Sequence, residues 1–261
     1  MLQAINITKY YGSAAKSKPI LQRVNLEVPD GSLVALIGES GGGKTTLCRI
    51  LTGLEKPDSG EIYLEGKLLG NLRQRSFEEC ASIQYVFQDP YASMDEDITV
   101  KSTLAEPVRL CKRNGRKHLE PGEALRYIGF NEKGLLDRKI KTLSGGQRQK
   151  IALARSLITN PRIIIADEST SMLDEESARE ITGIFKDLNR QLGISCLIVT
   201  HNIDLMCGLC EILYVIREGR IVDGGPKEQV FSSPRADYTV QFIECMKKLK
   251  GGTFFEPNNI C

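Results

Sequence analysis

A glycine-rich stretch near the N-terminus has the composition and spacing of a phosphate-binding loop. Residues 38–45, GESGGGKT, fit the pattern G-x-x-x-x-G-K-[ST] and lie between the apolar run SLVALIG and the helix-like segment TLCRILTGL. Glycines let such a loop curl with its N–H groups inward, and the following helix adds unpaired N–H groups and the positive end of its dipole. We therefore expect a pocket for phosphate oxygens formed by Gly38, Glu39, Ser40, Gly41, Gly42, Gly43, Lys44, Thr45 and Thr46.

Two side chains at the end of this loop could take part in chemistry. Lys44 can reach the terminal phosphates of a nucleotide, and the Thr45 hydroxyl can coordinate Mg²⁺, a hard cation that prefers oxygen ligands. The alternative is a flexible glycine loop with a surface lysine, which the complete motif and its flanks disfavour. Kinases, GTPases, helicases and transport ATPases share this loop, so it does not define the function by itself.

A second apolar run, IIIA at residues 163–166, ends in two carboxylates, Asp167 and Glu168. The carboxyl ends of buried parallel strands open on the nucleotide crevice of such folds. We expect Asp167 to hold Mg²⁺, directly or through water, and Glu168 to polarise an attacking water. An acidic turn after a strand is the plain alternative, and the phosphate loop upstream favours the functional interpretation.

Two further polar residues follow strand-like runs. His201 comes after SCLIVT and is placed to contact a γ-phosphate. Gln88, in VFQDP, could contact the metal or the water and sense which phosphates are present. Each signal is weak alone.

Another motif is LSGGQ at residues 143–147, whose adjacent glycines cannot fill a core but allow another group to approach the backbone closely.

The elements that must position these residues follow an α/β pattern. Strand-like alternation fills the first sixty residues, and residues 89–143 are helix-prone and interrupted by Pro90, Pro107 and Pro121. Strands and helices alternate again after that, and the segment FFEPNNIC at the C-terminus is expected to be loose. We expect one domain over residues 1–250, with a helical subdomain inserted at about 89–145, and a flexible tail at 251–261.

Composition excludes several classes of function. The chain has 261 residues, 41% hydrophobic and 26% charged, which is ordinary for a soluble globular protein. A net charge of +2 gives no reason to expect nucleic acid or an anionic membrane surface as a partner. The apolar runs are too short to span a bilayer, and the N-terminus does not have the pattern of a signal peptide. We therefore expect a cytosolic protein that a partner holds at any membrane it serves.

Eight cysteines are scattered along the chain, and free buried thiols are the default expectation. Cys207 and Cys210 form a C-x-x-C that could begin a metal or redox site. No second such pair accompanies it, whereas a structural zinc needs four ligands. The only histidines are His118 and His201, which excludes a histidine-rich metal site.

Taken in order, these motifs resemble the ATP-binding subunits of ABC transporters, and the likeness covers nearly the whole chain. LSGGQ shortly before a strand that ends in Asp-Glu is highly specific, since few other phosphate-loop families carry it. The resemblance implies an α/β P-loop NTPase with a RecA-like core, an N-terminal antiparallel β subdomain and an inserted α-helical subdomain. The residues that carry it are Tyr11, GESGGGKTT, Gln88, LSGGQ, IIIADE, SMLD at 171–174 and His201.

In that family two domains pack head to tail with two ATP molecules between them. The resemblance implies that Ser144, Gly145 and Gly146 contact the γ-phosphate of a nucleotide bound by the partner domain, and that Asp174 lies at the dimer interface. Tyr11, rather than Tyr10, would stack on adenine. ATP and Mg²⁺ are the implied cofactors. The implied catalytic residues are Lys44, Gln88, Glu168 and His201; the metal-site residues are Thr45, Gln88 and Asp167; and the further nucleotide-binding residues are Tyr11, Gln88, Ser144, Gly145, Gly146, Gln147 and Asp174.

Within the family the chain looks most like the importers of oligopeptides, dipeptides and nickel. The similar segments are VFQDPYASMDEDITV, LNRQLGISCLIVTHNIDLMCGLC and FSSPRADYTVQFI. The resemblance implies a second ATPase subunit, expected to be a different chain although a homodimer is possible, two transmembrane permease subunits and an extracytoplasmic solute-binding protein. It places the chain peripherally at the cytoplasmic face of the cell membrane. A cytoplasmic helix of the permease would contact Tyr91, Ala92, Ser93 and Met94.

Three alternatives remain at this point. An ABC exporter or lipoprotein-release ATPase shares every catalytic motif. A soluble ABC ATPase of DNA repair or translation would usually carry two ATPase halves or a long coiled coil, and a small-molecule kinase would lack LSGGQ. Ser169, Gly42 and Met172 depart from the commonest family residues, but none of them removes a group needed for chemistry. The cysteine-rich extension that accompanies an iron–sulfur cluster in some of these importers is missing, so no cluster is expected.

Overall fold

The computed structural model describes residues 1–12, 18–89, 91, 93–130, 132, 134–170, 173–200 and 208–249, with residues 246–249 described by their backbone only. The central element is a six-stranded sheet with the strand order β10-β9-β3-β8-β7-β6. Its strands are β3 (Leu33–Gly38), β6 (Ile83–Val86), β7 (Ile163–Asp167), β8 (Ser195–Val199), β9 (Ile212–Arg217) and β10 (Arg220–Pro226). All pairs are parallel except β9–β10.

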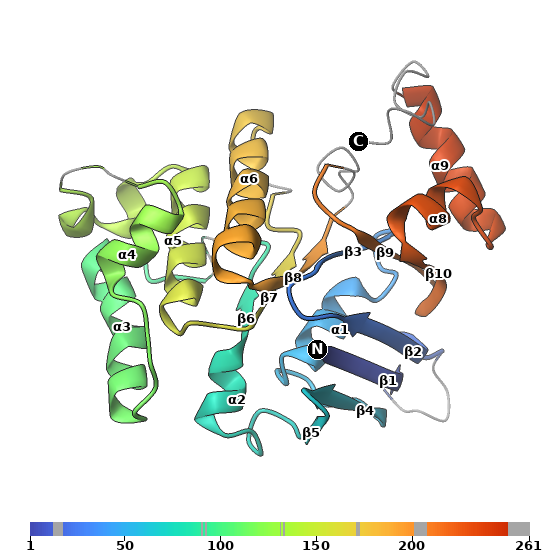
Figure 1. The fold of residues 1–261 in the computed structure, drawn as a ribbon, viewed down its shortest axis with the longest axis horizontal. Helices are drawn as coiled ribbons and strands as arrows, with labels where there is room; N and C mark the ends of the chain where they lie inside the picture. The colour runs from blue at the N-terminus through green and yellow to red at the C-terminus, as the bar shows by residue number, and fades with distance from the viewer. Residues whose placement is uncertain are drawn as a thin grey trace.

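The inner strands of this sheet are covered on both faces. Every residue of β3, β7 and β8 is buried, which explains why their sequences are continuous apolar runs rather than alternating ones. A second, antiparallel sheet has the order β2-β1-β4-β5, formed by β1 (Leu2–Lys9), β2 (Leu21–Val28), β4 (Ser59–Leu64) and β5 (Lys67–Leu69). Helix α1 (Lys44–Leu51) lies between the two sheets and shares one apolar core with them (Figure 1).

The other face of the large sheet carries the remaining core and most of the helices. Helices α3 (Val100–Arg113), α4 (Pro121–Tyr127), α5 (Gly145–Ile158) and α6 (Glu175–Leu192) pack there, with two short 3₁₀ turns at Leu135–Asp137 and Ile140–Thr142. In Figure 1, α3, α4 and α5 form a group on the opposite side of β6 and β7 from α1. Helix α2 (Phe77–Ser82) leads into β6, and α8 (Lys227–Ser232) and α9 (Asp237–Leu249) follow β10.

Two prolines of the helix-prone segment are accommodated in different ways. Pro121 occupies the first turn of α4, where its missing N–H has no partner to lose. Pro107 lies inside α3 and is buried there. No helix among the described residues combines the length and the apolar character needed to cross a bilayer.

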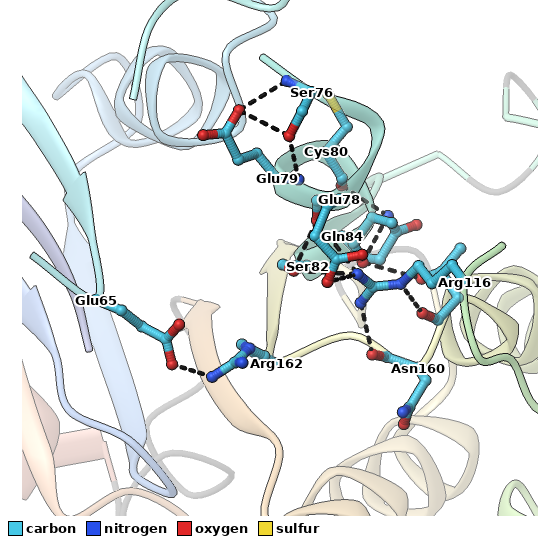
Figure 2. A network of polar contacts seen from close by, with 12 residues as sticks. Glu65, Ser76, Glu78, Glu79, Cys80, Ser82, Gln84, Arg116, Asn160 and Arg162 are labelled. Atoms are coloured by element: carbon cyan, nitrogen blue, oxygen red, sulfur yellow. Dashed lines mark hydrogen bonds and ion pairs between the residues drawn. The ribbon is translucent and has the colours of Figure 1, made fainter. Parts of the chain in front are cut away.

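The side chain of Arg116 attaches the helical group to the core. It follows α3, is only 8% exposed, and donates from Nε to the Thr159 carbonyl at 2.8 Å and from Nη2 to the Asn160 carbonyl at 3.0 Å (Figure 2). These carbonyls follow the end of α5, where the helix provides no N–H partners for them. Arg116 also forms an ion pair with Glu78 of α2. One guanidinium therefore links the end of α3, the end of α5 and α2.

We predict that Arg116→Ala lowers the free energy of unfolding by about 2 kcal/mol, because the carbonyls of Thr159 and Asn160 lose the charged donors of a largely buried guanidinium. Arg162→Ala is the matched control: this side chain is 56% exposed and pairs with Glu65 at the surface, so its loss changes stability by less than about 1 kcal/mol. Urea denaturation of both variants measures the difference. Equal effects of the two substitutions would contradict the role assigned to Arg116.

Candidate active site

Parallel strand register brings three of the sequence motifs to one edge of the large sheet. Asp167 at the end of β7 pairs with Val199 at the end of β8, and Val199 pairs with Leu36 near the end of β3. On the other side Ala166 pairs with Val86, the last residue of β6. Three motifs at the ends of these strands therefore share one edge: the phosphate loop, the acidic pair and the segment containing Gln88. His201 and the neighbouring Cys207 lie outside the described residues.

Two glycines of the loop are required by packing. Gly38 has φ 153°, and a Cβ built on it would lie 2.1 Å from the Ile216 carbonyl oxygen. Gly43 has φ 99°, and its Cβ would lie 2.7 Å from the side chain of Leu21. Any larger residue would push the loop away from β9 or β2. The glycine pattern thus reflects close packing of the loop against both sheets as well as its curvature.

The Lys44 side chain is held inside the loop. It is 5% exposed, and its Nζ donates to the carbonyl oxygens of Gly38 at 3.0 Å and Glu39 at 2.9 Å. The same nitrogen lies 3.8 Å from Glu168 Oε1. Helix α1 begins at Lys44 with neither a side-chain cap nor an acidic residue in its first turn. Buried positive charge and helix N–H groups thus meet where an anion would bind.

Asp167 is the most deeply buried acid of the site. It is 1% exposed, and its Oδ2 accepts a hydrogen bond from the Tyr85 hydroxyl at 2.7 Å. Burial, with the nearby Asp167 carboxylate, raises the pKa of Tyr85 well above its usual range, so the phenol keeps its proton. Asp167 Oδ1 is buried and has no hydrogen-bond partner among the described residues. Such an oxygen is costly to leave unpaired and suits a cation or a metal-bound water.

The surroundings of Asp167 are compatible with magnesium. No group of three or more His, Cys, Asp or Glu side chains gathers as metal ligands in the described part of the chain. Mg²⁺ commonly binds through one or two protein oxygens and completes its shell with water and phosphate. Asp167 and the Thr45 hydroxyl would supply such oxygens.

Glu168 adopts a backbone conformation that is rare for a residue with a side chain. Its φ is 47°, in the left-handed region, and its N–H donates to the Val199 carbonyl at 2.9 Å. Its carboxylate accepts a hydrogen bond from Gln88 Nε2 at 2.9 Å and lies near Lys44. Residues held in this way concentrate at functional sites. The structure therefore brings together Glu168, Gln88 and Lys44, three of the residues predicted to be catalytic.

The LSGGQ motif lies at the start of α5, not at the edge of the large sheet where the other motifs gather. Ser144 caps the helix: its hydroxyl accepts from the Gln147 N–H at 3.2 Å, while Gln147 Oε1 accepts from the Ser144 N–H at 3.1 Å. This capping box fixes the first turn. A Cβ on Gly146 would lie 2.9 Å from the Ser177 hydroxyl of α6, so this glycine allows the two helices to pack closely.

Two residues behind this turn join it to the segment after β6. The Arg148 guanidinium lies over the Tyr91 ring, 4.2 Å from its centre, and Gln149 Nε2 donates to the Phe87 carbonyl at 3.3 Å. The N-terminal part of α5 is thus in contact with residues on both sides of Gln88 along the chain. Asp174 caps α6, and hydrogen bonds from the Ser177 N–H and hydroxyl hold its pKa below the usual range.

Tyr11 offers an exposed aromatic face near the start of α1. Its ring is about half exposed, and its hydroxyl donates to Glu55 at 2.7 Å and lies 3.4 Å from the Thr46 hydroxyl. These contacts hold the ring in place while leaving area for stacking. The geometry is compatible with the adenine-binding role predicted for this residue.

A protein-family model described as ABC transporter matches residues 21–171 of the chain. The chain belongs to the ABC transporter family. Its fold, an ATP-binding cassette of the P-loop NTPase class, confirms the fold class predicted from the sequence. The cassette is the ATPase of this family, and it binds ATP.

Curated relatives carry the name of an importer component. The methionine import ATP-binding protein MetN of Mesorhizobium japonicum is 34% identical over 249 residues, which cover 95% of this chain and 66% of that protein. The protein of the same name from Escherichia coli is 33% identical over 248 residues, covering 94% of this chain and 71% of its own length. The chain thus spans about two thirds of the length of these relatives.

Solved structures of ABC cassettes have the same fold. The ATP-binding cassette MJ0796, in a dimeric post-hydrolysis state bound to ADP and Pi, matches with a TM-score of 0.74 and 28% identity over 87% of this chain and 98% of that one. CbiO1 from Clostridium perfringens, described as part of the ABC transporter complex CbiONQ, matches with a TM-score of 0.76 and 27% identity over 96% of this chain and 98% of that one.

Sequence reasoning missed Tyr85 and misjudged Met94. Tyr85 belongs to no motif, and its bond to Asp167 joins residues 82 positions apart. Met94, expected on a contact surface, is 7% exposed and belongs to the core. Its apolar side chain, beside more polar neighbours, was the available signal.

Among the cysteines, Cys48, Cys111, Cys196 and Cys210 are buried free thiols, and burial raises the pKa of Cys210 to about 12.

We predict that Lys44→Ala weakens ATP binding about 10- to 100-fold, because a charged donor to the phosphates is lost. Lys67→Ala, which removes a lysine that pairs with Glu79 at the surface, is the control and leaves affinity unchanged. Equilibrium binding of a fluorescent ATP analogue measures both. Unchanged affinity in Lys44→Ala would remove this lysine from the site.

Proposed function

We propose that the chain is the ATP-hydrolysing subunit of an ABC importer, bound peripherally at the cytoplasmic face of the membrane. The observation that carries the proposal is the cluster at the sheet edge, where Glu168 lies within reach of both Gln88 and Lys44. The import direction is supported by the relatives named for methionine import. These relatives favour import over the exporter or lipoprotein-release alternative.

In the proposed reaction, each residue of the cluster has one role. Glu168 accepts a proton from the water that attacks the γ-phosphorus in line, and Gln88 orients this water through its contact with the Glu168 carboxylate. Lys44 neutralises charge on the terminal phosphates. Thr45 and Asp167 would hold Mg²⁺, which offsets the negative charge that the phosphates carry. His201 is proposed to contact the γ-phosphate, as its position after β8 suggests.

The second half of each ATP site is proposed to come from a second ATPase subunit. Ser144, Gly145 and Gly146 open α5, which packs with the other helices of its group and with β6. Its N-terminal N–H groups and positive dipole end suit a γ-phosphate presented by another domain. The likeness to a cassette described as dimeric supports this arrangement. Closure on ATP and opening after hydrolysis would then form a two-state switch.

A groove between the core and α3 is the proposed docking site for the permease. Four apolar side chains that line it are roughly half exposed: Leu54, Leu72, Phe87 and Leu110. The ion pair between Arg155 and Glu106, at 2.9 Å, adds polar groups to its wall. A short amphipathic helix from a membrane subunit has the matching chemistry, with apolar residues for the groove and a polar side chain for this pair.

The cargo is proposed from sequence likeness. The segments around VFQDP and the C-terminal SPRADYT favour peptides or nickel chelates, whereas the relatives add methionine as a candidate. Substrate choice would reside in the solute-binding protein and the permease. Thermal-shift measurements on the cognate solute-binding protein with short peptides, nickel chelates and methionine would separate these candidates.

We predict that Glu168→Gln binds ATP with near-normal affinity but hydrolyses it at least about 100-fold more slowly, because the general base is lost. ATP should then hold the ATPase subunits together, which size-exclusion chromatography with and without ATP detects. Glu228→Gln, an exposed position on α8, serves as the control with normal turnover. Normal hydrolysis by Glu168→Gln would remove the role assigned to this residue.

We predict that the chain co-purifies with a permease pair, and that this complex with its solute-binding protein shows cargo-stimulated ATP hydrolysis. Leu110→Glu should abolish co-purification, because it places a charge in the apolar groove. ATP binding by the isolated variant should stay normal. Retention of the permease by Leu110→Glu would contradict the proposed docking site, and absence of any permease partner for the parent chain would contradict the transport function.

A further inference from the structure

The Tyr85 hydroxyl is the protein group that holds Asp167. Its Oη donates to Asp167 Oδ2 at 2.7 Å, while Oδ1 of the same carboxylate is buried and lacks a hydrogen-bond partner among the described residues. The two oxygens of one buried acid are thus unequal. One is satisfied by the protein, and the other is left for a donor or a cation.

This inequality matters because a carboxylate plane rotates easily. The terminal torsion of an aspartate is broad and roughly two-fold, so packing alone sets it loosely. A short hydrogen bond to one oxygen fixes the plane and thereby fixes the direction of the other oxygen. Partners of this kind, which orient a metal ligand without touching the metal, typically contribute 10- to 100-fold to metal affinity.

Tyr85 is well supported for this task. It lies on β6, where it pairs in parallel register with Ile165, two residues before Asp167 on β7, so both side chains are on the same face of the sheet. Its ring packs edge-on against Phe87, with centroids 4.5 Å apart. The hydroxyl is therefore delivered from a paired strand, which is more precise than delivery from a loop.

We propose that Tyr85 is a positioning residue for magnesium: its hydroxyl holds the Asp167 carboxylate so that Oδ1 faces Mg²⁺ or one of the waters bound to it. This proposal rests on the proposed function, in which Asp167 belongs to the metal site. A merely structural role would instead consist of satisfying a buried oxygen. The two roles differ in whether the effect of the hydroxyl depends on the metal.

The test measures how much magnesium strengthens nucleotide binding. The non-hydrolysable fluorescent analogue mant-AMPPNP is titrated into the full chain once with saturating Mg²⁺ and once with EDTA. The Kd in EDTA divided by the Kd with Mg²⁺ gives a ratio, which is compared between the parent chain and its variants. We expect Tyr85→Phe, which keeps the ring, to lower this ratio about 10-fold and to leave binding in EDTA unchanged. Asp167→Asn should bring the ratio close to one.

Tyr63→Phe is the matched control, because it removes a tyrosine hydroxyl that bonds Glu61 on the antiparallel sheet, and its ratio should equal that of the parent. If Asp167→Asn collapses the ratio and Tyr85→Phe does not change it, the positioning role is overturned while the metal site stands. An equal loss of affinity with Mg²⁺ and with EDTA in Tyr85→Phe overturns it in favour of a structural role. A normal ratio in Asp167→Asn contradicts the metal assignment in the proposed function, and this inference with it.

Discussion

A buried lysine is the charge around which the site is arranged. Lys44 lies inside a loop whose carbonyl oxygens accept hydrogen bonds from its ammonium group, close to the Glu168 carboxylate. Burying an ammonium group is costly unless partners compensate it, and two carbonyl oxygens and a carboxylate do so here. An anionic phosphate would add to this compensation. The position of this charge depends on where α1 begins, and packing between the two sheets fixes that helix.

Each of the two apolar cores supports a different part of the molecule. One core, around α1, supports the phosphate loop against both sheets. The other joins the large sheet to the helices that carry LSGGQ and the groove. Phe87 directly follows β6. Its carbonyl oxygen accepts a hydrogen bond from Gln149 of α5, and its ring lines the groove. Gln88, which contacts Glu168, is its neighbour along the chain. The proposed hydrolytic site and the proposed docking groove are thus separated by very few residues.

The sequence was sufficient to predict which polar side chains gather wherever they stand at the end of a strand. Asp167, Glu168 and Gln88 each follow an apolar run, and parallel pairing brings such ends together without further information. Contacts across elements could not be predicted in this way. The Tyr85–Asp167 bond depends on the register of β6 against β7, and the Arg116 contacts depend on where α5 ends. Met94 shows the same limit, since a polar-looking segment contributes one side chain to the core.

The left-handed backbone of Glu168 has a consequence for anyone who engineers this chain. A non-glycine residue in that region carries strain of about 1 kcal/mol or more. Glycine, or asparagine to a lesser degree, would relieve it. A selection for heat resistance alone would therefore favour replacing this residue. Under the catalytic role proposed for Glu168, it would enrich proteins that survive warming but no longer hydrolyse ATP. At this one position, thermal stability and the proposed catalytic role oppose each other.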